Sequence, residues 1–485
     1  MNFFFNSILF LSKKLLLFLP FIITFESMNR FKNVINQSML ESPVSVLIIK
    51  MAIPTIISML VMSAYGMVDI FFVSRLGTGA SAAVGIVFAI LTMTQAVGSM
   101  IGIGAGNLIS ESLGANDNKN ASNIASVAFF LSIIFGIIVT TLGIIFKEEL
   151  MNILGATKTI LPLAKEFAHY ILIASPIICC SYVLNILLRS QGKPKSSMIG
   201  LSIGAIANII LEPIFIFKLN WGIKGAALAT ATGQTCSFII LLILYISNKK
   251  LAKISFTSFI INSKNYITKI CSNGSPTLLR QGLVVIANVL VNVTARKYGD
   301  SAIAAFSITN RILLIAVSIM FGLGQGFLPV VGFSFGAKKF DRIKKAYFFT
   351  TTLGIIILTI IAFFLYNFST EIIKFFQKDP SVIAIASKVI QYFAISLPLI
   401  PLTITTNMIF QVTEKIGISI FLSSCRQGIF FIPLIFILPP ALGIKGLELC
   451  QPIANIVSAL ICVPFIIFYF KTQDKTQTNN PPSDK

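Results

Sequence analysis

Two acidic residues lie well inside apolar stretches of the sequence, where carboxylates are rare. Asp69 lies in "YGMVDIFFV", and Glu212 lies in "NIILEP". An ionisable group inside a membrane helix costs several kcal/mol unless it has a partner, so such a group indicates function. Asn208 precedes Glu212 by four residues and Tyr65 precedes Asp69 by four, so each pair is expected to share one helix face.

These oxygen-bearing side chains suit two kinds of chemistry. Two neighbouring buried carboxylates repel each other, so at least one of them is expected to take up a proton. A hard cation such as sodium can instead lie among the oxygens of Asp69, Asn208, Glu212 and Thr230. We therefore predict a site for either H⁺ or Na⁺, with Tyr65 beside it, and no other cofactor.

The helices that carry these residues are expected to place them at similar depths. Asp69 comes about four residues before the end of the first predicted span, and Glu212 about five before the end of the fifth. Thr230 comes about eight residues into the sixth span, which runs in the opposite direction. Because a helix rises about 1.5 Å per residue, all three side chains are expected at one level of the membrane.

The composition is that of a membrane protein. Of 485 residues, 55% are hydrophobic and 11% are charged, whereas soluble domains carry about 25% charged residues. Apolar runs of about 20 residues or more recur along the chain and predict an all-α, multi-pass protein with twelve transmembrane helices. The predicted spans are 46–73, 82–110, 122–146, 162–188, 196–217, 222–247, 268–295, 302–332, 346–367, 382–411, 417–439 and 445–470.

The net charge of +21 comes from basic residues in short loops. Such loops set the orientation of a membrane protein and do not indicate nucleic-acid binding. Placing residues 28–45 inside the cell puts most of these residues on the cytoplasmic side, so both termini are predicted to be cytoplasmic. The basic residues on that side are Lys193, Lys195, Lys249, Lys250, Lys253, Lys264, Lys269, Lys338, Lys339, Arg342, Lys344 and Lys345.

An internal repeat divides the chain into two halves. A shift of 222 residues places "LGTGASAAVGI" on "YGDSAIAAFSI" and "SLGA" on "SFGA". Two halves of six helices each enter the membrane in the same direction, and the substrate site is expected between them. The same shift places Val291 at the position of Asp69, and Glu212 falls near Leu434. The carboxylates are therefore a property of the first half alone.

The ends and the linker complete the predicted organisation. The apolar segment before Met28 contains Lys13 and Lys14 and is a poor signal peptide, so it is an interfacial segment or precedes the true start. We predict an N-terminal extension at 1–45, a first lobe at 46–247 and a cytoplasmic linker at 248–267. A second lobe at 268–470 and a polar tail at 471–485 follow.

Enzymatic chemistry has little support in the sequence. The seven cysteines lie in or beside apolar segments, without the spacing of metal ligands or of a disulfide framework. A single histidine, His169, provides neither a metal site nor a proton relay. We therefore predict that the protein is not an enzyme.

Several segments taken in order resemble the multidrug and toxic compound extrusion (MATE) family of transporters. The resemblance covers nearly the whole chain after about residue 45. It lies in "PTIISMLVMSAYGMVDIFFVSRLG", "GIGAGNLISESLGA", "LRSQGKPKSSMIG", "NIILEPIFIF", "WGIKGAALAT" and "LPVVGFSFGAKK". It is closest to the bacterial branches whose cation site lies in the N-terminal lobe.

The resemblance implies a V-shaped pair of six-helix lobes in the bacterial inner membrane, surrounded by lipid and working as a monomer. It implies outward extrusion of amphipathic, often cationic, organic compounds by alternating access, driven by proton or sodium entry. The family pattern of the cation site matches Asp69, Asn208, Glu212 and Thr230, although the acid in the fifth helix is usually Asp. Pro54 is implied to be the point at which the first helix bends.

A lipid-linked glycan flippase of the same superfamily is the alternative function. Such proteins usually carry more charges in the central cavity and often have extra helices. The second half of the chain contains three arginines in or near its helices, namely Arg280, Arg311 and Arg426. Their roles stay open at this stage, because each can line a polar cavity, extend its charge to the membrane surface or have a structural role.

Overall fold

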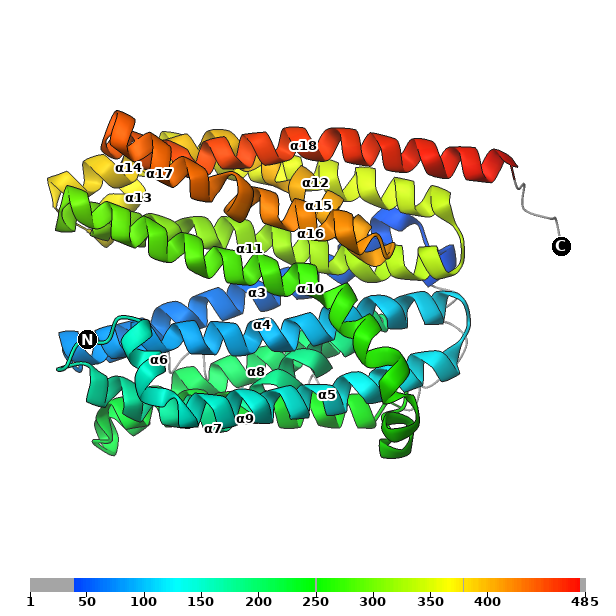
Figure 1. Cartoon of the computed structure of the whole chain (residues 1–485), viewed down its shortest axis with the longest axis horizontal. Helices are drawn as coiled ribbons and strands as arrows, with labels where there is room; N and C mark the ends of the chain where they lie inside the picture. Colours follow the sequence, from blue (N-terminus) through cyan, green and yellow to red (C-terminus); the bar gives the residue numbers. More distant parts are fainter. Residues whose placement is uncertain (1–38, 249–250, 378, 480–485) are drawn as a thin grey trace.

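The computed structural model describes residues 39–248, 251–377 and 379–479, with side chains up to Gln473. The described chain is almost entirely helical and forms two bundles (Figure 1). The bundles lie as two layers that approach each other at one end, on the right of Figure 1, and diverge toward the other. This arrangement agrees with the predicted V-shaped pair of lobes.

The first lobe contains the helices before the linker, and the second lobe contains those after it. The first comprises α3 (Val44–Ser74), α4 (Thr78–Gly114), α5 (Asn118–Ile145), α6 (Lys147–Ile153), α7 (Leu161–Ser190), α8 (Pro194–Pro213), the π-helix η1 (Ile214–Lys218) and α9 (Gly222–Ile246). The second comprises α10 (Phe256–Ala295), η2 (Arg296–Tyr298), α11 (Asp300–Gly336), α12 (Phe340–Asn367), α13 (Ser369–Phe376), α14 (Pro380–Ser396), η3 (Leu397–Leu399), α15 (Ile400–Val412), α16 (Ile416–Ser424), the π-helix η4 (Cys425–Ile429), α17 (Phe431–Leu442) and α18 (Ile444–Asn479).

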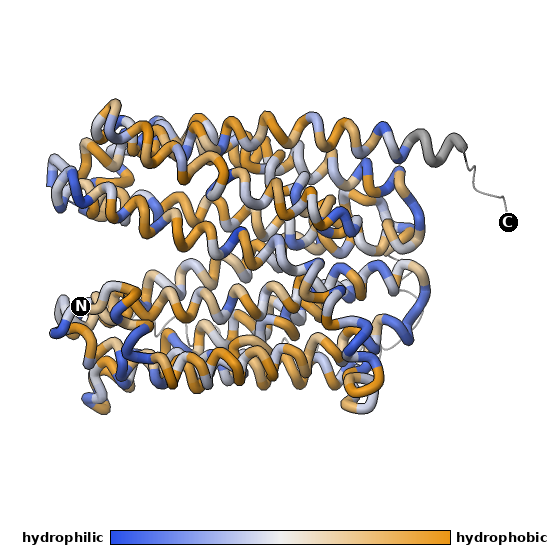
Figure 2. The backbone as a smooth tube through the Cα atoms, in the orientation of Figure 1, coloured by the Kyte–Doolittle hydropathy of each residue, from blue (hydrophilic) through white to orange (hydrophobic). Residues whose placement is uncertain are grey.

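Twelve helical segments of the described chain are long and apolar enough to cross a membrane, which agrees with the sequence prediction. Hydrophobic residues cover the lengths of the helices, and hydrophilic residues gather in the turns at both ends (Figure 2). Large apolar side chains such as Ile137, Leu142 and Phe363 are more than half exposed on the outer faces. These surfaces suit contact with lipid, where exposed apolar side chains carry no penalty.

Some helix ends differ from the predicted spans. α10 begins at Phe256, inside the predicted linker, and α18 continues to Asn479, inside the predicted polar tail. Both extensions are too polar for a hydropathy window to include them, yet helices can continue beyond the membrane. The predicted extension at 1–45 lies mostly outside the described residues, which begin at Met39.

The repeat is reproduced in the local geometry. Asn185 of α7 donates hydrogen bonds to the carbonyl oxygen and the hydroxyl group of Ser197, at 3.0 and 2.6 Å. Asn407 of α15 donates at 2.7 Å to the carbonyl oxygen of Ser419, and each of these two residues lies 222 positions after its first-lobe counterpart. The second lobe thus repeats the turn between the fourth and fifth spans of the first.

The turns that start α4 and α11 are also equivalent. Gly77 has φ of 110° and Gly299 has φ of 94°. Glycine adopts these positive angles without the steric cost that a side chain would add. The glycine at this position therefore allows the chain to reverse direction between the first two spans of each lobe.

The two lobes contact each other closely at the end predicted to face the cytoplasm. A Cβ atom at Gly114 of α4 would lie 2.2 Å from the carbonyl oxygen of Phe333, and one at Gly336 of α11 would lie 1.9 Å from that of Glu111. These two contacts exchange under the repeat, so a pseudo-twofold axis passes between them. Asn107 also donates to Asn273 at 2.9 Å across the interface.

A candidate cation site in the first lobe

Asp69 of α3 and Glu212 of α8 meet inside the first lobe. Asp69 is 8% exposed and Glu212 is fully buried. Their carboxyl groups lie close enough to form a hydrogen bond with each other once one of them is protonated. The sequence-based depth estimate therefore placed these two residues correctly with respect to each other.

Three further predicted residues surround the two acids, and all three are buried. Asn208 donates a hydrogen bond to the hydroxyl oxygen of Thr230 at 3.3 Å. The hydroxyl group of Tyr65 lies near Thr230 and near both carboxyl groups. Helices α3, α8 and α9 thus bring Tyr65, Asp69, Asn208, Glu212 and Thr230 to one place.

The site has more acceptors than donors. Within the described chain, no donor reaches Oδ1 of Asp69, Oδ1 of Asn208, or either carboxylate oxygen of Glu212. Buried acceptors without donors are costly, and two adjacent carboxylates repel each other when both are ionised. A proton between the carboxyl groups, or a hard cation among the oxygens, removes both costs. The donor set therefore fits H⁺ or Na⁺.

Small residues allow α8 and α9 to approach at this level. A Cβ atom at Gly233 would lie 2.8 Å from both the carbonyl oxygen of Gly204 and Cβ of Asn208. This close approach brings the amide of Asn208 to Thr230. A cavity of about 10 Å³ lies beside the contact, which is near the lower limit for a single water molecule. Its lining includes Tyr65, Asn208 and Thr230.

The helix after Glu212 is irregular. Pro213 ends the α-helical part of this span, and the π-helix η1 follows it directly. π-Helical turns are rare and often occur at functional sites. A short turn at residues 219–221 then leads into α9. In this turn the backbone N–H of Trp221 donates to the carbonyl oxygen of Phe215 at 3.1 Å.

Pro54 lies inside α3, about four turns before Asp69. It has no N–H group, so one hydrogen bond of the helix is missing there. The hydroxyl groups of Thr55 and Ser58 donate to carbonyl oxygens one turn earlier, at 2.6 and 2.9 Å, and such bonds often bend helices. The local structure is compatible with the predicted bending point, whose role stays a prediction.

The three arginines of the second lobe have different surroundings. Arg311 is exposed on α11. Arg280 of α10 and Arg426 of η4 are partly buried and lie close enough together to repel each other. The sequence indicated neither this proximity nor the π-helix that carries Arg426.

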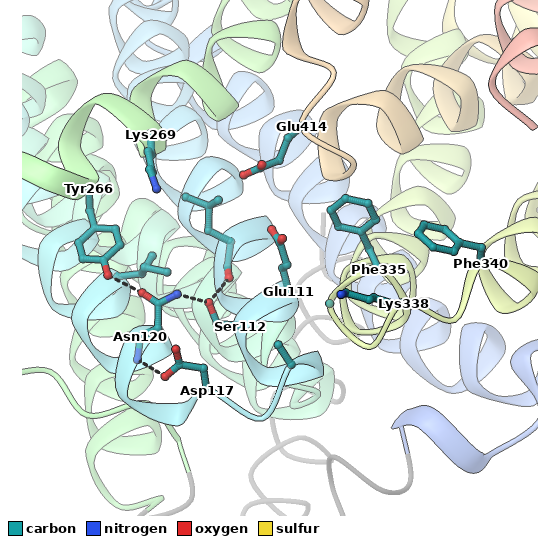
Figure 3. A pocket seen from close by; sticks show the side chains of 14 residues that line it. Glu111, Ser112, Asp117, Asn120, Tyr266, Lys269, Phe335, Lys338, Phe340 and Glu414 are labelled. Atoms are coloured by element: carbon teal, nitrogen blue, oxygen red, sulfur yellow. Dashed lines mark hydrogen bonds between the residues drawn. The ribbon is translucent and has the colours of Figure 1, made fainter. Parts of the chain in front are cut away.

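A second pocket lies between the lobes at their closely packed end (Figure 3). Its volume is about 530 Å³. Glu111 of α4 and Glu414, which follows α15, extend into it from opposite lobes, and Lys269 of α10 lies nearby. Glu111 is repelled by Glu414 and attracted by Lys269. Sequence analysis missed this cluster because Glu111 and Glu414 are ordinary polar residues at the ends of helices.

The family model MatE matches residues 54–214 and again residues 276–437, once in each lobe. The chain belongs to the MATE family. Its twelve candidate spans within the described residues, its two lobes and its internal repeat are those expected from the resemblance.

Individual MATE relatives align over nearly the full chain. The multidrug export protein MepA of Staphylococcus saprophyticus is 26% identical over 436 residues, which cover 88% of this chain and 94% of MepA. MepA of Staphylococcus aureus strain MRSA252 is 26% identical over 425 residues, covering 87% and 93%. A MATE crystal structure in complex with MaL6 superposes with a TM-score of 0.86 at 25% identity and covers 90% of this chain and 99% of that one.

Proposed function

We propose that this MATE protein exports amphipathic, cationic organic compounds in exchange for protons or sodium ions. The similarity to multidrug export proteins supports drug export. The buried pair formed by Asp69 and Glu212 is the observation that supports ion coupling. Carboxylates at this depth attract both the coupling cation and a cationic substrate, so the two compete for the same negative charge.

Helix α3 provides a physical link between the cation site and the lobe interface. It carries Asp69 near one end and contacts α11 of the other lobe along its length. Ser63 of α3 hydrogen-bonds with Ser318 of α11 at 3.3 Å. Nearer the predicted cytoplasmic end, a Cβ atom at Gly322 of α11 would lie 2.7 Å from Cα of Ile56. A change in α3 therefore acts directly on the contact between the lobes.

The proposed cycle alternates between two arrangements of the lobes. In the described arrangement the lobes are joined at the predicted cytoplasmic end, which supports a state that opens to the outside. Binding of H⁺ or Na⁺ between Asp69 and Glu212 removes their mutual repulsion and favours a different bend of α3 at Pro54. Substrate and cation then stabilise different states, which is the requirement for exchange.

Uptake into everted membrane vesicles tests this function and identifies the ion. The vesicle lumen then corresponds to the cell exterior, so an outwardly directed gradient of the coupling ion should drive ethidium into the lumen. A pH gradient and a sodium gradient are imposed separately, each with the other ion equal on both sides. Uptake under one gradient identifies the coupling ion, and absence of uptake under both contradicts the proposed exchange.

We also propose that the protein acts as a monomer in the bacterial inner membrane with both termini in the cytoplasm. The lysine- and arginine-rich loops at this end of the helices support this orientation. A protease site added after Lys485 should be cut in everted vesicles and protected in intact cells. Cleavage in intact cells instead would reverse the orientation, and with it the assignment of the closed end.

A further inference from the structure

Arg280 and Arg426 are two adjacent cationic groups without an anionic partner. Within the described chain, neither guanidinium group donates a hydrogen bond or forms an ion pair. Arg189 of α7 provides the contrast, because it is buried but donates to the side-chain oxygens of Asn185 and Gln325. The protein thus satisfies the buried guanidinium group of Arg189 internally and leaves two others together with unused donors.

The guanidinium group of Arg280 has a defined position. Its Cζ atom lies 4.7 Å from the ring centroid of Phe321 in α11, which is a cation–π arrangement. Such a contact uses the face of the planar group and leaves its N–H edge free. Phe321 directly precedes Gly322, which packs against Ile56 of α3. Arg280 therefore lies in the part of the second lobe that borders the first.

Arg426 is placed against Arg280 by the π-helix η4. This segment packs on α10, because a Cβ atom at Gly428 would lie 3.1 Å from the side chain of Leu283. Leu283 follows Arg280 by less than one helical turn. The like charges are therefore held together by helix packing, which is unfavourable unless an anion binds between them.

The internal repeat relates Arg280 and Arg426 to positions in the first lobe. Arg426 lies 222 residues after Gly204, and Arg280 lies 222 residues after Ser58. In the first lobe, Gly204 lines the small cavity that also contains Tyr65 and Asn208 of the candidate cation site. At the position of Gly204, which borders this cavity in the first lobe, the second lobe therefore carries the positive charge of Arg426.

We propose that Arg280 and Arg426 form a binding site for an oxyanion, namely the phosphate or carboxylate group of an amphiphile. Each guanidinium group offers a pair of parallel N–H donors that match the geometry of a carboxylate or phosphate group. The neighbouring apolar side chains Phe321 and Leu283 suit the hydrocarbon part of the ligand. The site extends the ligands of the protein to molecules with an anionic group and does not depend on ion coupling in the first lobe.

Isothermal titration calorimetry of the purified full-length protein in a nonionic detergent tests the proposal. The probes are inorganic phosphate and short-chain phosphatidic acid, with the matching diacylglycerol as the uncharged control. We expect saturable binding of phosphatidic acid that weakens about tenfold or more in Arg280→Gln and in Arg426→Gln, because each loses charge-assisted hydrogen bonds. Binding of inorganic phosphate as well identifies a free-anion site, whereas its absence identifies a site for lipid-like phosphates.

Matched variants separate this site from general effects. Arg311→Gln removes an exposed arginine of the same lobe and should bind phosphatidic acid like the wild type. Arg280→Lys keeps the charge but not the planar fork, so it should bind more weakly than the wild type and more tightly than Arg280→Gln. Unchanged thermal unfolding midpoints exclude misfolding. No saturable binding of either probe by the wild type, or equal affinity in all variants, overturns the proposal.

Discussion

Gly114 and Gly336 make equivalent contacts from opposite sides of the lobe interface. Each glycine faces a backbone carbonyl oxygen of the other lobe, at Phe333 and at Glu111 respectively. Neither position has room for a methyl group, because a Cβ atom would lie about 2 Å from a carbonyl oxygen. Closure of this end therefore depends on the absence of two side chains related by the repeat.

Gly336→Ala should disfavour closure of the lobes at this end. Forcing a methyl group into a packed interface typically costs about 1–3 kcal/mol, so the closed arrangement should lose population by roughly fivefold or more. Spin labels at Lys119→Cys and Lys345→Cys, in a background without the native cysteines, report the distance between the lobes. We expect a longer distance in Gly336→Ala.

Gly85→Ala is the matched control for this substitution. Gly85 also lies in a long helix, but a Cβ atom there meets nothing within 4 Å. Its substitution should leave the distance between the labels unchanged. An unchanged distance in Gly336→Ala would show that this contact does not hold the lobes closed.

Asp69→Asn and Glu212→Gln should each abolish ion-driven ethidium efflux while leaving the fold intact. Each variant keeps the size of the side chain and removes one of the two negative charges that attract the cation. We expect transport to fall by about tenfold or more in everted vesicles, with equal protein in the membrane. Glu371→Gln, an exposed acid of α13, should transport normally, and full efflux in both site variants would refute ion coupling at this pair.

Gly233→Ala should disturb the cation site without changing any of its ligands. The added Cβ atom would lie 2.8 Å from Cβ of Asn208, so α8 and α9 must separate and the hydrogen bond from Asn208 to Thr230 must lengthen. We expect a lower unfolding midpoint, at a cost of about 1–3 kcal/mol, together with weaker ion coupling. Gly66→Ala on α3 meets nothing within 4 Å and should change neither, and equal behaviour of the two variants would contradict this account.

Glu414→Gln should stabilise the closed arrangement of the lobes. The substitution removes the repulsion of Glu111 by a second carboxylate across the interface. Because both groups line an open pocket, the effect should be modest, at about twofold to fivefold in the closed population. High salt should produce the same change in the wild type by screening and almost none in Glu414→Gln. A salt response of equal size in both proteins would exclude repulsion as the cause.

The sequence predicted the features that depend on distance along single helices. Apolar runs locate the spans, and counting residues from their ends places Asp69 and Glu212 at one depth. The repeat predicts two equivalent lobes, and the paired hydrogen bonds of Asn185 and Asn407 agree with it. The start of α10 was misplaced because residues 256–267 mix polar with apolar side chains, and a hydropathy window does not recognise such a helix.

Contacts between helices were not predictable in the same way. The proximity of Arg280 and Arg426 depends on the π-helix η4, which changes the direction of side chains within one span. The approach of Glu111 to Glu414 depends on how the lobes are inclined. Neither the helical register after a π-helix nor the angle between lobes can be read from hydropathy or from a repeat.

Trp221 is the only tryptophan of the chain, and it lies at the junction between η1 and α9. Its backbone is tied to Phe215, a few residues after Glu212. Its indole ring is 45% exposed and lies 5.3 Å from the ring of Phe215, centroid to centroid, so a rearrangement of this span should change the surroundings of the indole. We therefore expect the intrinsic fluorescence of Trp221 to report cation binding in real time without any chemical label.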